Sequence, residues 1–186
     1  MEMKDLVQVG LENATKMLYD ALDGLTASEL KWQPRPDANS IGLLFFHFVR
    51  VEDSAIHDIQ GKPHLWVKEK WYQKFNKTVD AGQGNLTAEQ ISAFVLPDMK
   101  EWLVYAEAVR KDTLAYLKGL KNKDFEKQVD LTPPSTPAVA TGGNAALPPA
   151  HFTVVIGPLL MHMIAALSGR AGEISYIRGL QRGMDK

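Results

Sequence analysis

Histidines are the main candidates for chemistry in this chain of 186 residues, because it contains no cysteine. The lack of cysteine excludes disulfides, thiolate-bound zinc, iron–sulfur clusters and a cysteine nucleophile. Two of the five histidines, His47 and His162, stand in the apolar runs LLFFHFV and LLMHMI. His57, His64 and His151 stand in polar or loop-like settings, and we predict that they are surface residues.

The two histidines in apolar runs have two interpretations. A single histidine on an apolar helix face is usually a hydrogen-bonded core residue. Two of them, on two long helices, favour a shared site, because sites in helical bundles are built from side chains that point inward from facing helices. His47 and His162 are therefore candidate ligands. The alternative, that each is a hydrogen-bonded core residue, stays open.

Four segments repeat apolar residues at spacings of three and four, which indicates amphipathic helices. These helices are expected at about 4–24, at 39–61, at 99–120, and from Thr153 or Pro158 to Arg182. No alternating β-branched run predicts a strand.

The connections between these helices carry their own signals. The spacing of Thr26 to Glu29, and of Thr87 to Gln90, is that of a capping box and predicts the start of a short helix at each place. Residues 62–84 hold several aromatic residues among lysines without a clear period, and we predict a long connection anchored by those aromatic side chains.

Residues 131–149, LTPPSTPAVATGGNAALPP, contain five prolines and two glycines and interrupt the helical pattern. We interpret them as a flexible crossover loop, and the alternative is a lid or an arm that contacts a dimer partner. The whole pattern predicts an all-α protein: a four-helix bundle with a long crossover between the third and fourth helices, forming a single domain over residues 1–186.

Composition excludes several partners. Lys and Arg (21) nearly balance Asp and Glu (22), so the formal charge is −1 and a nucleic-acid partner is not expected. No apolar run approaches the roughly 18 residues that span a membrane. The amphipathic N-terminal segment lacks the apolar core of a signal peptide, and we expect a soluble cytoplasmic protein with no membrane partner.

Two parts of the chain resemble a known family. Residues 32–36 (WQPRP), followed by residues 40–47 (SIGLLFFH), resemble the start of the second helix in the DinB/YfiT-like superfamily. Residues 159–162 (LLMH) and 172–180 (GEISYIRGL) resemble its closing helix. The resemblance implies a four-helix bundle, a homodimer, and a metal held by one histidine on helix two and a His-x-x-x-His pair on helix four. Characterised relatives include transferases and isomerases that use mycothiol or bacillithiol.

On this resemblance, His47 matches the first metal ligand, whereas Ala166 and Arg170 stand where the helix-four pair is expected. Neither can supply a neutral nitrogen, because alanine has no donor atom and arginine stays protonated. His162 lies one turn before Ala166, where family members often carry an additional histidine. The resemblance thus implies a degenerate site in which His47 and His162 hold a divalent metal such as zinc, nickel or iron. The unranked candidates for a third ligand are Asn13, Glu107 and Asp112.

Two classes of function stay open. The first is an enzyme, a thiol-dependent transferase or hydrolase with an altered metal site at His47 and His162. The second is a metal-free module in which His47, His162 and Arg170 bind a small anionic ligand, with the guanidinium replacing the charge of the metal. In the alternative for Arg170, its side chain points to solvent or pairs with an acidic neighbour.

The same module could instead serve dimerisation. The small residues between Ala165 and Gly172 favour close approach of another helix, either from the same chain or from a second copy. A homodimer is therefore expected in either class of function.

Overall fold

The structure is a computed structural model that describes residues 2–83, 86–131 and 153–183. It is mostly helical, and the prediction of an all-α fold is confirmed. The four long helices are α1 (Met3–Leu22), α3 (Ile41–Asp58), α7 (Met99–Gly119) and α8 (Ile156–Arg182). The shorter helical elements are α2 (Ala27–Lys31), α4 (Leu65–Lys68), α5 (Trp71–Lys74), α6 (Ala88–Ser92) and the 3₁₀ turn η1 (Asn122–Glu126).

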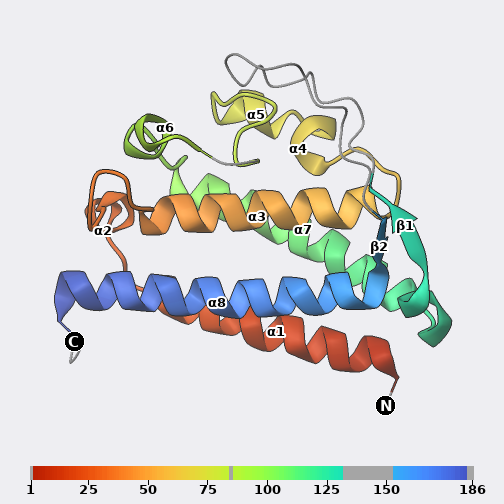
Figure 1. Ribbon diagram of the computed structural model, residues 1–186. Helices are drawn as coiled ribbons and strands as arrows, with labels where there is room; N and C mark the ends of the chain where they lie inside the picture. The colour runs from red at the N-terminus through yellow and green to blue at the C-terminus, as the bar shows by residue number, and fades with distance from the viewer. Residues whose placement is uncertain (1, 84–85, 132–152, 184–186) are drawn as a thin grey trace.

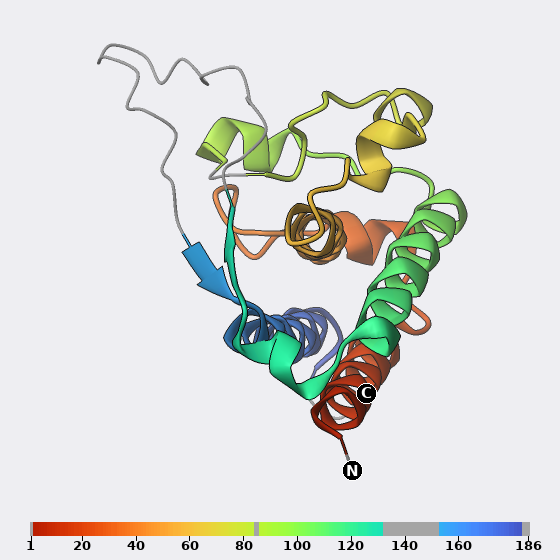
Figure 2. The same cartoon turned by 90° about the vertical axis from the view of Figure 1, so that its right-hand side faces the viewer.

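Helix α3 is the central element of the molecule. It lies between α8 on one side and the short helices α4 and α5 on the other, and α7 crosses beside it (Figures 1 and 2). Helix α1 packs along α8 on the side away from α3 (Figure 1). Because neighbours surround α3, most of its side chains are buried, including charged ones.

Local chemistry explains where several helices begin. Ser40 Oγ accepts a hydrogen bond from the Leu43 amide and caps α3. Thr26 and Thr87 form the expected capping boxes at α2 and α6. Each cap satisfies amide groups that have no partner within the helix. The two predicted short-helix starts are confirmed.

The interior divides into two hydrophobic clusters. The larger one contains the buried residues of α3 and α7 that face the aromatic side chains of segment 62–75. The smaller one joins the N-terminal half of α1 to the end of α7, η1 and the start of α8. Apolar burial on this scale is the main favourable term in folding.

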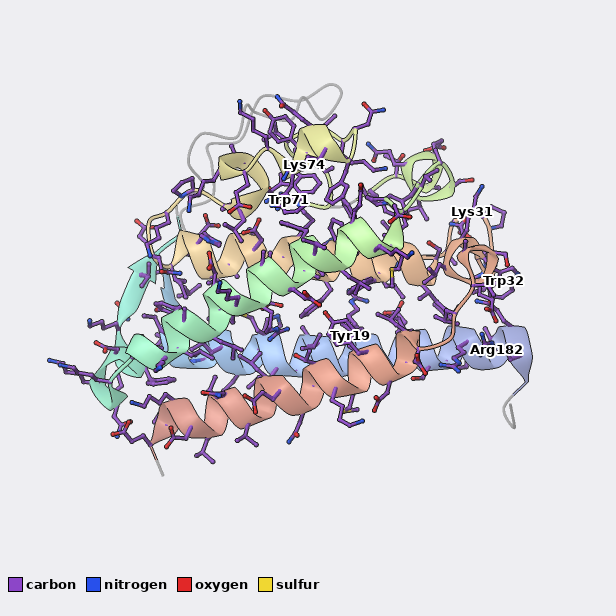
Figure 3. The ribbon with its side chains drawn as sticks, turned by 180° about the vertical axis from the view of Figure 1, so that it is seen from behind. Tyr19, Lys31, Trp32, Trp71, Lys74 and Arg182 are labelled. Carbon is purple, nitrogen blue, oxygen red and sulfur yellow. The ribbon has the colours of Figure 1, made fainter. Side chains whose placement is uncertain are left out.

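Residues 62–83 carry aromatic anchors, as predicted. Trp66 is fully buried and lies 6.4 Å from Trp102 and 5.5 Å from Tyr105 between ring centroids. Trp71 stacks on Phe75 at 5.5 Å, and the ammonium of Lys74 lies 3.8 Å from the Trp71 ring centroid (Figure 3). The contacts of Trp66 fasten the segment to α7, and the segment itself forms the short helices α4 and α5.

Two strands contradict the sequence prediction that no strand is present. Strand β1 (Gln128–Asp130) pairs antiparallel with β2 (Thr153–Val155). Each strand has only three residues, too few for an alternating pattern to be recognised in the sequence. The last helix begins at Ile156, directly after β2. The predicted loop at 131–149 lies outside the described residues, apart from Leu131.

The end of α8 is tied to α2. Arg182 Nη2 donates hydrogen bonds of 2.8 Å to the Gly24 carbonyl and to Glu29, and Gln181 donates to the Glu29 carbonyl (Figure 3). Over the ranges that the structure describes, no helix is both long enough and apolar enough to cross a membrane.

Candidate functional site

His47 is held in one orientation by the loop before α6. Its Nδ1 lies 2.9 Å from the carbonyl oxygen of Gly82. A carbonyl oxygen only accepts hydrogen bonds, so Nδ1 carries the proton and Nε2 of the neutral ring has a free lone pair. Gly82 has φ +79°, and a Cβ at this position would lie 2.7 Å from Phe46 and 2.8 Å from Arg50. Glycine therefore permits this close approach.

The imidazole of His47 is neutral at physiological pH. Burial lowers its pKa below the ordinary value, and the nearby charge of Arg170 lowers the pKa further, against the opposing effect of the Gly82 hydrogen bond. A neutral imidazole offers one hydrogen-bond acceptor, or one metal ligand, at Nε2.

The side chain of Arg170 reaches the region of His47 from α8. This side chain is 37% exposed, and Nη1 lies 2.5 Å from the Glu173 carboxylate one turn later. Together with His47 it lines a cavity of about 330 Å³. The other lining residues come from the start of α3, the Gly82 loop and the α6 region: Asn39, Leu43, Leu44, Gly82, Leu86 and Ile91.

His162 does not line this cavity. It is exposed on α8, eight residues before Arg170 and thus roughly 12 Å away along the helix axis. Of the three side chains proposed from the sequence, the structure brings His47 and Arg170 together and leaves His162 outside.

The other candidate ligands do not line this cavity either. Asn13 and Glu107 are exposed on α1 and α7, and Asp112 pairs with His57 instead. Within the ranges given above, no cluster of three or more His, Asp or Glu side chains is placed to hold a metal ion. The residues around His47 therefore do not fit a three-ligand metal centre.

The prediction that His57 lies on the surface is wrong. It is 4% exposed, because α4 and α7 cover the polar side of α3. His64 is largely buried as well, with 15% of its side chain exposed, and it lies 2.7 Å from Asp58. His151 lies outside the described residues.

A charged stripe on α3 was not recognised from the sequence. Arg50, Asp53 and His57 are spaced by three and four residues, so they lie along one face of the helix, and all three are buried. Complementary charges at this spacing were the signal that could have identified the stripe. Arg50 Nη1 lies 3.1 Å from Asp53, and its Nε donates to the Ala81 carbonyl at 3.0 Å.

The Asp53 carboxylate is the centre of this stripe. It accepts hydrogen bonds of 2.9 Å from the amides of Leu65 and Trp66, at the start of α4. It also accepts one of 2.6 Å from the Tyr105 hydroxyl. Burial would raise the pKa of Asp53, but these bonds and the contact with His57 lower it below its usual value. Asp53 therefore stays ionised and acts as a tertiary cap of α4.

A second charged group joins α3 to α7. Buried Glu52 accepts hydrogen bonds of 2.7 Å from Thr113 Oγ1 and 2.8 Å from Arg110 Nη2. Burial raises the pKa of Glu52, while Arg110 and Thr113 oppose the rise. This pair lies beside the aromatic core and is a structural contact between helices.

Comparison with known proteins identifies the family. A family model of the DinB superfamily matches residues 11–147. The chain belongs to the DinB superfamily. The matched range ends before α8, so the positions of Ala166 and Arg170 lie beyond it.

A solved structure supports the DinB fold. The crystal structure of a conserved protein from Enterococcus faecalis is 21% identical, and the similarity covers 97% of both chains with a TM-score of 0.76. At this identity the likeness concerns the fold alone. A search of curated proteins found no match.

Proposed function

We propose that this DinB-superfamily protein binds a small anionic ligand in the cavity between α3 and α8. Arg170 is the charged anchor, and Nε2 of His47 is the directional hydrogen-bond acceptor. The observation that carries the proposal is that a guanidinium and a neutral imidazole with a free Nε2 line one cavity of about 330 Å³. A cavity of that volume suits a small metabolite.

The chemistry of the two side chains defines the ligand class. A guanidinium binds carboxylate or phosphate through two parallel N–H donors. The bond to Glu173 uses Nη1 and leaves the donors at Nε and Nη2 for a ligand. Nε2 of His47 accepts from a hydroxyl or ammonium group on that ligand. The best match is a small carboxylate or phosphate that also carries a donor group.

On this proposal, the set of metal ligands that the family implies is incomplete in this chain. His47 is retained, and Ala166 and Arg170 replace the other two histidines. A guanidinium at the third position disfavours a cation beside His47 by charge repulsion. The alternative, a thiol-dependent transferase or hydrolase with an altered metal on His47 and His162, needs His162 to approach a cavity that it does not line.

We also infer that the chain is one DinB-type four-helix domain, with a crossover between α7 and α8, and that it forms a homodimer. On the outer face of α8, Gly169 and Gly172 are exposed, and a Cβ on either would contact no other side chain. Packing against α1 therefore does not require glycine there. Close contact with a second copy of the chain would explain the small residues on that face.

Thermal unfolding with citrate tests the ligand proposal. Citrate is expected to raise the melting temperature of the wild type more than that of Arg170→Ala, because a ligand that binds only the folded state stabilises it. Arg35→Ala is the matched control, since Arg35 is exposed and pairs only with Asp37 among the described residues. An equal rise in Arg170→Ala, or none in the wild type, would show that Arg170 does not anchor an anion.

A further inference from the structure

A second cavity, of about 410 Å³, lies at the other end of α3. It is formed by the end of α3, the loop into α4 and the second half of α7, and its charged or polar walls come from His57, Lys62, Lys68, Asp112 and Tyr116. It shares no lining residue with the cavity at His47. His57 lies ten residues after His47, roughly 15 Å along the axis of α3.

Hydrogen bonds hold the imidazole of His57 in one orientation, with Nε2 directed toward the cavity. Its Nδ1 lies 2.8 Å from the backbone oxygen of Asp53 and 2.9 Å from the Asp53 carboxylate. Both partners are acceptors, so Nδ1 carries the proton. Nε2 is then the ring atom left for the cavity, where it lies 3.4 Å from the Asp112 carboxylate. The bonds that hold Asp53 to Tyr105, Leu65 and Trp66 make this arrangement rigid.

The charges that face the cavity are unequal. Lys62 and Lys68 supply two positive charges against the single carboxylate of Asp112. Lys62 is held at the cavity by a 2.7 Å hydrogen bond to Gln60. Burial would lower the pKa of His57, but Asp53 and Asp112 outweigh it and raise the pKa, so the ring adds positive charge as the pH falls. The excess of positive charge favours an anion.

Asp112 limits which anions fit. It is 42% exposed and accepts hydrogen bonds, so a ligand must present a donor to it. Pro63 and the half-buried ring of Tyr116 add apolar wall. The cavity therefore combines two cationic side chains, one acceptor and one imidazole Nε2 that donates when the ring is charged.

We propose that this cavity is a second ligand site, which binds a small hydroxylated anion such as a phosphorylated polyol. The anionic group contacts the ammonium groups of Lys62 and Lys68. A hydroxyl group of the ligand donates to Asp112, and His57 Nε2 donates to a ligand oxygen when the ring is charged. The proposal goes beyond the function proposed for the cavity at His47, because it uses other residues.

Three probes separate these contacts in nitrogen-15 NMR titrations of the full chain. Glycerol 3-phosphate carries both the anion and the hydroxyls, methyl phosphate carries only the anion, and glycerol carries only the hydroxyls. Glycerol 3-phosphate is expected to shift the His57 Nε2 resonance in a saturable way. Methyl phosphate should bind at least about fivefold more weakly, and glycerol should not saturate, because each lacks one set of contacts. No shift at His57 with glycerol 3-phosphate would overturn the proposal.

Exposed lysines provide variants that keep the fold. The double substitution Lys62→Gln with Lys68→Gln is expected to weaken glycerol 3-phosphate binding by about tenfold or more. The matched control is Lys16→Gln with Lys100→Gln, which removes the same charge from exposed positions on α1 and at the start of α7 and should bind like the wild type. Equal weakening in both double variants would show that binding depends only on the overall charge of the protein, and would refute the proposed site.

Arg170→Ala distinguishes the two proposals. In this variant, glycerol 3-phosphate is expected to shift the His57 Nε2 resonance as in the wild type, while the shift of the His47 Nε2 resonance with citrate is lost. If Arg170→Ala loses glycerol 3-phosphate and the variant at Lys62 and Lys68 keeps it, the second site is refuted and the cavity at His47 is supported. If citrate leaves the His47 resonance of the wild type unshifted while glycerol 3-phosphate shifts that of His57, the function proposed for the cavity at His47 fails and the second site stands.

Discussion

The hydroxyl of Tyr105 on α7 donates a 2.6 Å hydrogen bond to Oδ2 of Asp53 on α3, where both side chains are fully buried. Burial raises the pKa of Tyr105, so its proton stays on the oxygen and is available to Asp53. The same carboxylate receives the first amides of α4. One ionised group therefore connects α3, α7 and the aromatic segment between them.

Replacing this carboxylate should be costly. Asp53→Asn is expected to lower the free energy of unfolding by about 3–5 kcal/mol, because the amide leaves Arg50 without a charged partner and turns an NH₂ toward other donors. Urea denaturation measures the loss. The control Asp20→Asn changes an exposed pair with Lys16 and should stay within about 0.5 kcal/mol of the wild type. Similar small losses in both variants would mean that the buried network adds no stability.

The two histidines on α3 should titrate in opposite directions from the ordinary value of 6.5. NMR titration is expected to find the pKa of His47 below it and that of His57 above it. His57 stabilises the fold fully below the unfolded-state pKa, and this contribution is lost as the pH rises through the folded-state pKa. His47 acts in the opposite sense, because the unfolded chain takes up the proton first as the pH falls below 6.5.

The corresponding variants test the sign of each effect. Relative to the wild type, His57→Gln should lose more stability at about pH 5.5 than at about pH 8.5, whereas His47→Gln should make the protein less sensitive to acid. Chemical denaturation at both pH values measures the difference. A pKa for His57 below that of His47 would contradict both expectations.

Gly82 should be intolerant of a side chain. Gly82→Ala is expected to lower stability by about 1–3 kcal/mol, because φ is positive and the added Cβ meets Phe46 and Arg50. It should also displace the Gly82 carbonyl from His47 and raise the fraction of the other imidazole tautomer, which NMR detects. Gly119→Ala is the control: that glycine ends α7 and faces open space, so alanine should be neutral or stabilising by up to about 1 kcal/mol. Equal stability of the two variants would show that the loop adapts.

Metal analysis tests the proposal that the metal site at His47 is degenerate. Protein purified without a histidine tag or chelator, then incubated with zinc or nickel and desalted, is expected to hold far less than one metal ion per chain. A chelator should leave its melting temperature unchanged, since no bound ion stabilises the fold. Stoichiometric metal that is lost in His47→Ala would refute the metal-free proposal and favour the enzyme.

The helices and their caps could be predicted from sequence because they depend on local spacing. The apolar repeats predicted α1, α3 and α7 to within about three residues, and Thr26 and Thr87 marked two short helices. The strand pair could not be predicted, because the two three-residue strands pair across more than twenty residues of chain. The irregular segment at 131–149 stays a prediction.

For the candidate site, too, the sequence predicted some features and the tertiary structure decided the others. The resemblance to the DinB superfamily singled out His47 as a candidate ligand and predicts that Ala166 and Arg170 stand at the other two ligand positions. Only the tertiary structure decided that Arg170 lies beside His47, that His162 does not, and that His57 is buried against Asp53. The physical reason is that helical spacing determines which residues share a face, whereas packing of other segments determines which faces are covered. The aromatic segment 62–75 covers the polar stripe of α3 and makes both the buried network and the second cavity.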